Sequence, residues 1–244
     1  MRIAIISDIH EDYITLESAS AALKKHDFDL LVCLGDITGF APQYYSHKPD
    51  ANICLDWIRE YADIVIPGNH DLYSVGRLPS YHTEIKMPHN WYSLSYEQQK
   101  KVSNNELWLY ENEIKPPLSD INRDFLKNRP EIASIETDQG KILLSHFIFP
   151  DYCGVTCRFP LNKRDLNSHY LFMQENGYNL SFVGHAHPNG VLKIGRFRWS
   201  FPSWKSQQIK NSRLVICPPL VNGHDFKSFM IYNTETKVIT PITL

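Results

Sequence analysis

Residues 1–10 read MRIAIISDIH, a short apolar run followed at once by Asp8 and His10. We interpret the run as a buried β-strand and the two polar residues as the start of the loop after it. Similar runs lie at residues 30–34, 64–66, 142–144 and 180–183, and each is also followed by a polar cluster. Functional side chains of open α/β sheets gather at the carboxyl ends of the strands. We therefore expect one rim to collect a ligand set large enough for two metal ions, namely Asp8, His10, Asp36, Asn69, His146, His185 and His187.

The composition of the chain limits the classes of function. It has 244 residues, of which 43% are hydrophobic, which suits one large domain or two small ones. Lys and Arg number 25 against 27 Asp and Glu, and the net charge of -2 gives no general signal for nucleic-acid binding. No apolar stretch is long enough to span a bilayer, and Asp8 interrupts the first run too early for a signal sequence. We expect a cytoplasmic protein that acts on a small molecule without a membrane partner.

The order of the expected elements predicts a mixed α/β fold. Strands at 2–6, 30–34 and 64–66 alternate with helices, an order typical of a parallel sheet with right-handed crossovers. The later elements are a hairpin at 132–137 and 141–145, a helix near 165–176, and short strands at 190–194, 197–201, 213–217, 227–232 and 237–242. This part is mostly antiparallel. We expect a four-layer α-β-β-α sandwich, in which two mixed sheets pack face to face with helices outside.

Residues 72–130 interrupt this order. They predict helices at 96–101, 104–113 and 119–128, the last of them capped by Ser119 or Asp120. We interpret the stretch as a helical insert beside the site, within a single domain of residues 1–244. Its aromatic residues favour a packed helical cluster over a base-stacking platform: Trp91, Tyr92, Tyr96, Trp108 and Tyr110. The insert is also the expected substrate lid or partner surface.

Taken singly, the polar clusters are weak signals, because an Asp or His after a strand is more often a cap or a satisfied hydrogen-bonding group than a ligand. Their order is more specific. Asp-x-His, Gly-Asp, Gly-Asn-His-Asp, His and Gly-His-x-His follow one another between Asp8 and His187. This pattern resembles the calcineurin-like metallophosphoesterase superfamily, and within it the small bacterial and archaeal phosphoesterases. The sequence after Gly35-Asp36 lacks the arginine of the protein Ser/Thr phosphatases, which argues against phosphoprotein substrates.

The resemblance implies two metal sites that share one carboxylate: Asp8, His10 and His187 for one ion, Asn69, His146 and His185 for the other, and Asp36 for both. Imidazole ligands suit Mn, Fe, Zn or Ni better than Mg or Ca. Two such ions lower the pKa of a bridging water, and the hydroxide attacks phosphorus in line. Asp36 and His70 are the expected catalytic residues, with His70 protonating the leaving oxygen. The expected activity is hydrolysis of a phosphate ester, a phosphodiester or a nucleotide.

Several nearby residues allow two interpretations. Asp71 either orients His70 or caps the following helix, and we favour the cap. Glu11 and Asp12 either repel an anionic substrate or begin the first helix, and we favour the helix. Arg158 is a predicted substrate contact together with Asn69 and His70, although exposed loop cations are usually only solvated.

The five cysteines form no Cys-x-x-Cys pair. Cys33 and Cys217 lie in apolar runs and are expected to be buried thiols. Cys153 and Cys157 share an expected loop, where a redox switch or a soft-metal site is the less favoured interpretation.

Two other functions stay open at this stage. The fold also supports a scaffold that binds a protein partner, against which the complete ligand set argues. A hydrolase of a different bond is disfavoured, because Gly184–Asn189 lacks the rest of the His-x-His-x-Asp-His pattern of lactamase-type metal sites.

Overall fold

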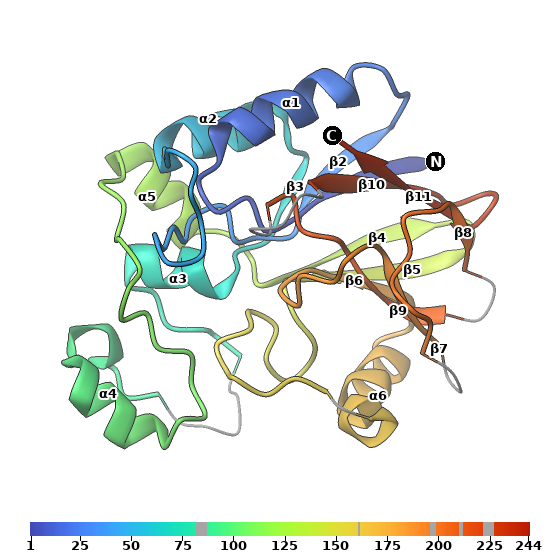
Figure 1. Cartoon of the computed structure of the whole chain (residues 1–244). Coiled ribbons are helices and arrows are strands. Elements are labelled where there is room, and N and C mark those ends of the chain that lie inside the picture. The colour runs from blue at the N-terminus through green and yellow to red at the C-terminus, as the bar shows by residue number, and fades with distance from the viewer. Residues whose placement is uncertain (82–86, 161, 196–198, 210–211, 222–226) are drawn as a thin grey trace.

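Two mixed β-sheets lie face to face in the computed structural model of the chain (Figure 1). The structure describes residues 1–244 apart from 82–86, 161, 196–198, 210–211 and 222–226. The strand order of the first sheet is β3 (Ile64–Val65), β2 (Leu30–Cys33), β1 (Arg2–Ile6), β10 (Ser228–Asn233), β11 (Val238–Thr243) and β8 (Gln207–Gln208). That of the second is β4 (Ile132–Thr137), β5 (Gly140–Ser145), β6 (Tyr178–Val183), β9 (Ser212–Ile216) and β7 (Leu192–Gly195).

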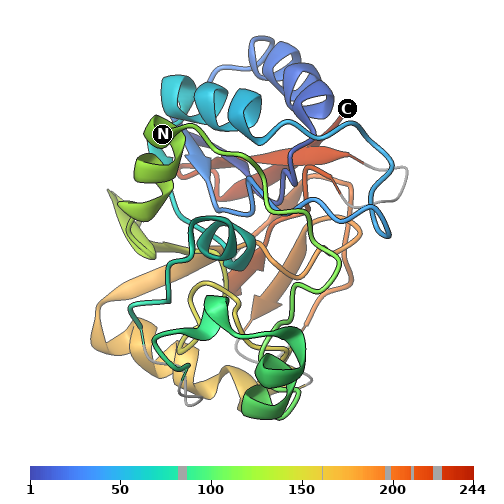
Figure 2. The same ribbon diagram turned by 90° about the vertical axis from the view of Figure 1, so that its left-hand side faces the viewer.

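Helices cover both outer faces, which confirms the predicted four-layer sandwich. Helices α1 (Tyr13–Leu23) and α2 (Ala51–Tyr61) lie on the first sheet, and α6 (Asn167–Glu175) lies on the second (Figure 2). The remaining helices are α3 (Asn69–Val75), α4 (Tyr96–Ser103) and α5 (Asp120–Lys127), with short 3-10 turns at Trp91–Ser93 and Lys163–Leu166. Within the described residues, no helix is long and apolar enough to cross a membrane.

Strict alternation along the strands separates the core into layers. Ile3 and Ile5 of β1 point into the space between the sheets, where they meet residues such as Leu144 of β5. Ala4 and Ile6 point the other way and pack under α1 and α2. Because a shift of one residue would exchange the two faces, and both are buried, this pattern fixes the register of β1.

The parallel strands decide where the polar clusters lie. Strands β1, β2 and β3 run parallel to one another, and so do β5, β6 and β9. The loops that leave β1, β2, β3, β5 and β6 therefore emerge at the carboxyl edges of the two sheets, as the sequence predicts. These loops carry six of the seven predicted ligands, and the seventh, Asn69, begins helix α3 directly after the loop that leaves β3.

The insert departs from the prediction at one place. Helix α4 and helix α5 form near their expected positions, and Ser119 caps α5 by accepting a hydrogen bond from the Asn122 N–H. The predicted helix at 104–113 is wrong. Asn104 and Asn105 have φ angles of 49° and 60°, and this left-handed backbone ends α4.

The chain after Asn105 runs extended between two loops of the sandwich. The Trp108 N–H donates to the Val155 carbonyl at 2.9 Å, and the Ile114 N–H donates to the Phe40 carbonyl at 3.0 Å. Residues 107–114, here called the bridging segment, are thereby joined to the loops after β5 and β2. The segment does not become a helix because backbone groups near both of its ends bond to these loops, and the Glu113 N–H bonds to the Tyr110 carbonyl in a turn.

The C-terminal part follows the prediction with small shifts. Gly177 ends the α6 region with a left-handed φ of 73°, as expected for a helix stop. Of the predicted strand at 197–201, residues 197 and 198 lie outside the described residues, and Trp199 forms only an isolated bridge with Ile194.

Candidate metal centre and active site

The first ligand cluster consists of Asp8, His10 and His187 and joins the loops after β1 and β6. The Nε2 atom of His187 lies 3.1 Å from Asp8 Oδ1 and 3.2 Å from His10 Nε2. His10 Nδ1 lies 3.0 Å from the Gly39 carbonyl, which can only accept, so Nδ1 carries the hydrogen and Nε2 presents a lone pair. Burial, reinforced by His187, lowers the pKa of His10 to about 3. His10 is therefore the neutral imidazole that a metal ion requires.

The second cluster joins the loops after β2, β5 and β6 and holds Asp36, His146 and His185. His146 Nδ1 lies 2.6 Å from the Leu34 carbonyl, which fixes its hydrogen there and leaves Nε2 3.0 Å from Asp36 Oδ2. Burial lowers the pKa of His146, but the adjacent Asp36 carboxylate outweighs it and raises the pKa to about 9. The geometry thus calls for positive charge between these two atoms.

Two buried atoms test whether a metal ion fits this cluster. Among the described residues, Asn69 Oδ1 and His185 Nε2 have no hydrogen-bond partner, and His146 Nε2 faces only the carboxylate of Asp36. Burial lowers the pKa of His185 to about 3, so its ring is also neutral. Buried polar atoms without partners are costly. The second cluster offers one amide oxygen, two imidazole nitrogens and a carboxylate. These are suitable donors for a transition-metal ion, so the residues of the cluster fit such an ion.

The backbone at the ligands is held in an unusual conformation. Positive φ angles between 43° and 64° occur at Asp8, His10, Asp36, His185 and His187. Left-handed backbone is rare outside glycine, costs free energy, and persists where the surroundings enforce it, often at functional sites. Gly68 is part of this enforcement, because a Cβ there would lie 2.1 Å from Asp36 Oδ1. The space that glycine leaves is filled by the carboxylate.

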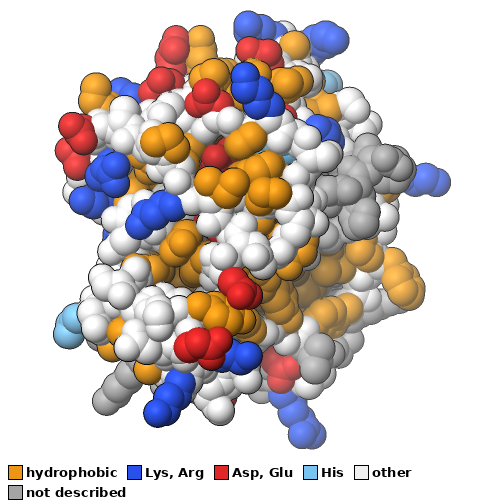
Figure 3. All heavy atoms as spheres, turned by 60° about the vertical axis from the view of Figure 1, so that its left-hand side comes forward, with side chains coloured by type: hydrophobic (Ala, Val, Ile, Leu, Met, Phe, Trp, Pro, Cys, Tyr) orange, Lys and Arg blue, Asp and Glu red, His pale blue; other side chains and the backbone are white. Residues whose placement is uncertain are grey.

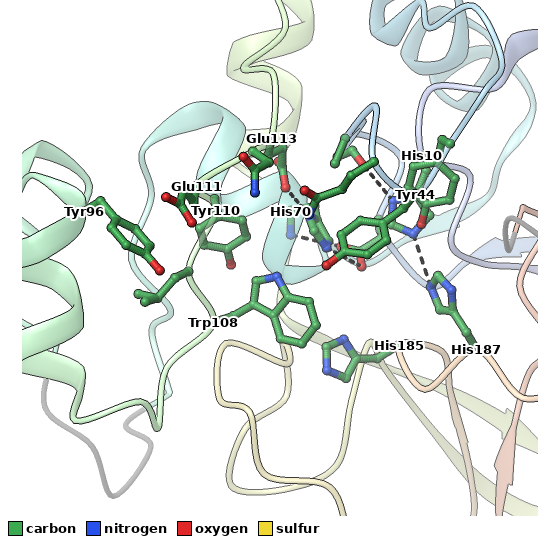
Figure 4. A pocket seen from close by; sticks show the side chains of 17 residues that line it. His10, Tyr44, His70, Tyr96, Trp108, Tyr110, Glu111, Glu113, His185 and His187 are labelled. Atoms are coloured by element: carbon green, nitrogen blue, oxygen red, sulfur yellow. Dashed lines mark hydrogen bonds and ion pairs between the residues drawn. The ribbon is translucent and has the colours of Figure 1, made fainter.

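His70 stands beside the clusters with one nitrogen committed. Its Nδ1 lies 2.5 Å from Glu113 Oε2, and its Nε2 lies 4.0 Å from Asp36 Oδ2 (Figure 4). Burial lowers the pKa of His70, but Glu113 and Asp36 together raise it to about 10. The ring is therefore protonated at neutral pH, and its Nε2–H is the available donor.

Asn69 is oriented by the bridging segment. Its Nδ2 donates to the Tyr110 hydroxyl at 3.3 Å, and that hydroxyl donates to the Asn69 carbonyl at 3.2 Å. With the amide nitrogen held in this way, Oδ1 is the atom left for the cluster. Tyr110 is buried and stacks on Tyr73 with 4.2 Å between ring centroids, so its hydroxyl is firmly placed.

Glu113 and Tyr110 are the residues that sequence reasoning missed. Both lie in the stretch predicted to be helical, where an aromatic or acidic residue gives no sign of a site. The only available signal is the pair of asparagines at 104 and 105, residues that tolerate a left-handed backbone and can end a helix early.

Other predicted residues occupy structural positions. The Asp71 carboxylate caps α3 by accepting a hydrogen bond from the Gly68 N–H at 3.0 Å, which is the role that the sequence analysis favoured. It also accepts from the Ile37 and Thr38 N–H groups. The Asp12 carboxylate caps α1 by accepting a hydrogen bond from the Thr15 N–H at 2.9 Å.

Glu11 does not begin helix α1, which starts at Tyr13. Its buried carboxylate accepts from the Gly39 and Phe40 N–H groups at 3.0 and 3.3 Å. Because the Gly39 carbonyl orients His10, Glu11 supports the ligand loop instead of opposing a substrate.

Arg158 does not line the cavity at the ligand clusters, and its guanidinium lies 3.1 Å from the Glu106 carboxylate. Cys33 and Cys217 are buried, as predicted. Cys153 is buried and Cys157 is exposed.

A cavity of about 680 Å³ opens onto both ligand clusters. Its walls come from the clusters, from residues 39–45, and from the bridging segment with Tyr96. The face shown in Figure 3 is hollowed, and hydrophobic side chains gather in the hollow. Figure 4 shows Trp108 between His70 and His185, with Tyr44 on the other side of the opening.

The model of the calcineurin-like phosphoesterase family matches residues 1–189, more than three quarters of the chain. The chain belongs to this family. This membership agrees with the two ligand clusters.

One relative shows a distant similarity in sequence. An uncharacterized protein of Methanocaldococcus jannaschii, MJ0912, is 25% identical over 195 residues, which are 76% of this chain and 62% of that protein. The chain therefore spans less than two thirds of the length of this relative.

Solved structures of other proteins share the fold of this chain. A metallophosphoesterase from Sphaerobacter thermophilus has a TM-score of 0.67 at 20% identity, covering all of this chain and 88% of that one. Hypothetical protein PH1004 from Pyrococcus horikoshii has a TM-score of 0.61 at 13% identity, covering all of this chain and 87% of that one.

Replacement of Tyr110 by Phe tests the orientation of Asn69. The Tyr110→Phe variant frees the amide to rotate, and we expect metal affinity at the second cluster to fall by about 10- to 100-fold, as for other groups that orient metal ligands. Calorimetric titration with Mn²⁺ measures the change, and the exposed Tyr61→Phe on α2 is the matched control. Equal affinities for the two variants would show that Tyr110 does not orient the ligand.

Proposed function

We propose that the chain is a phosphoric ester hydrolase with a dinuclear metal centre, acting on a phosphodiester or a nucleotide. The observation that carries the proposal is the pair of ligand clusters on one rim, with unpartnered acceptor atoms in the second. Asp8, His10 and His187 would hold one ion, Asn69, His146 and His185 the other, and Asp36 both. The proposed metals are Mn, Fe, Zn or Ni, because the ligands are rich in imidazole.

Asp36 is the proposed shared ligand. Its Oδ2 faces His146, its Oδ1 accepts from the backbone N–H of His70 at 3.0 Å, and its charge also acts on His10 of the other cluster. A carboxylate has two oxygens with which to serve two ions. Bound divalent ions would activate water as the nucleophile and neutralise charge on the phosphoryl oxygens.

His70 is the proposed proton donor to the leaving oxygen. Glu113 holds its Nδ1, so that the imidazolium keeps one orientation and directs Nε2–H into the cavity. The ring of His70 lines the cavity beside the place that a phosphoryl group would occupy, whereas Asn69, predicted as a second substrate contact, is fully buried and does not line the cavity. A donor in this position lowers the barrier most for esters whose leaving oxygen is a strong base.

Two features favour a diester or nucleotide over a phosphoprotein. The loop after Asp36 has no arginine, and the cavity is lined by aromatic side chains suited to a small organic group. The complete ligand set also favours an enzyme over a scaffold, because a site used only for binding a protein needs no converging metal ligands.

Asp36→Asn should abolish metal loading and turnover, since an amide cannot serve two cations in place of a carboxylate. Metal content by mass spectrometry and hydrolysis of bis(4-nitrophenyl) phosphate with Mn, Fe, Zn, Ni and Mg in turn provide the measurement. Asp27→Asn, at an exposed position, is the control. Full activity of Asp36→Asn would contradict the assignment.

His70→Ala should keep the metal content and slow hydrolysis by about 10²- to 10⁴-fold for poor leaving groups, with a smaller effect for good ones. A series of aryl diesters with phenols of rising pKa measures this dependence. If the loss were the same for every phenol, His70 would not be the proton donor.

Glu113→Gln keeps the size of the side chain and removes its charge. We expect a smaller loss than for His70→Ala, again concentrated on poor leaving groups, because Glu113 acts through His70. In the double variant the two losses should not add, since residues that act as a unit are strongly coupled. Additive losses in the same diester series would separate Glu113 from His70.

A further inference from the structure

The cavity at the ligand clusters is larger than a phosphate group requires. Its volume of about 680 Å³ lies within the range of sites that enclose a whole small molecule, roughly 300–1,000 Å³. His10, Asp36, His185 and His187 mark its metal end. From there it extends along residues 108–113 towards Tyr96. This outer part has room for the organic group of the ester.

The charge of the outer part excludes a chain of phosphates. Among the described lining residues there is no Lys or Arg. The carboxylates present are Glu113, which is engaged by His70, and Glu111, which is exposed. Proteins hold non-reacting phosphate groups with cationic side chains and converging N–H donors. A wall of aromatic rings, with one carboxylate paired to His70 and the other exposed to solvent, suits an uncharged group better than an anionic one.

Trp108 provides a fixed aromatic surface beside the metal end. Its ring centroid lies 6.2 Å from those of His70 and His185, at interplanar angles of 74° and 69° (Figure 4). Its backbone is held by the bond to Val155. Tyr44 lines the same cavity and is 66% exposed. Two such rings offer stacking surfaces for a planar group.

We infer that the substrate carries a single phosphoryl group and an uncharged planar ring, a nucleobase or an aryl group, that packs on Trp108. This rests on the proposed phosphoesterase function and adds to it a class of organic group and a specificity-determining residue. Tyr44 flanks the same ring from the open side of the cavity.

The test compares two phosphonates that differ in the ring alone. Methyl phenylphosphonate and methyl methylphosphonate each carry one negative charge, and the P–C bond replaces an ester bond. Dissociation constants for the Mn²⁺-loaded protein are measured by calorimetry, which needs no turnover. The hydrolysis screen with different metals is independent of this readout, so failure of ring recognition and failure of the phosphoesterase function are distinguishable.

In the wild-type chain the phenyl compound should bind about 5- to 150-fold more tightly, the range expected for one stacked ring. Trp108→Ala should bring the ratio close to one, Trp108→Phe should retain most of it, and metal content should not change. Phe201→Ala, at a position 91% exposed and outside the cavity, is the control and should keep the wild-type ratio. Adenosine and benzyl alcohol, titrated separately, distinguish a nucleobase from a simple aryl group.

Two results would overturn the inference. One is equal affinity of the wild-type chain for the two phosphonates. The other is a ring preference that survives unchanged in Trp108→Ala, which would place the ring elsewhere.

Discussion

Imidazole nitrogens and carboxylate oxygens that converge on a buried rim are the constraint on which the rest of the structure depends. His146 Nε2 lies 3.0 Å from Asp36 Oδ2 because the other nitrogen of the ring is bonded to the Leu34 carbonyl. His10 is fixed in the same way by the Gly39 carbonyl. Lone pairs brought together out of water repel unless positive charge lies between them. The fold holds these atoms in place through strained backbone at the ligands and through glycines that leave room for side chains.

The bridging segment, residues 107–114, makes the insert part of the site. It bonds to the loop after β2 through Phe40 and to the loop after β5 through Val155, so it connects loops of both sheets. Between these two points it presents Trp108 to the cavity, Tyr110 to Asn69 and Glu113 to His70. One stretch of chain therefore sets a ligand amide, a proton donor and an aromatic wall. A small change in its path would alter all three together.

The sequence predicts the ligand clusters well because parallel strands share an edge, and a polar residue after each buried run must appear there. Asp8, Asp36 and His146 are placed by this rule alone. The layers follow from alternation in strands such as β1, where Ile3 and Ala4 belong to different cores. The bridging segment could not be predicted, since its extended form depends on backbone partners about 50 to 75 residues away in sequence and on two asparagines that stop α4. For the same reason Glu113 was not identified as the partner of His70.

The central claim is that two metal ions share Asp36. Electron paramagnetic resonance of the protein loaded with two equivalents of Mn²⁺ tests it most directly, because ions joined by one carboxylate are magnetically coupled. The account predicts the spectrum of a coupled pair at full loading. A spectrum of isolated Mn²⁺ ions at that loading would contradict the shared ligand.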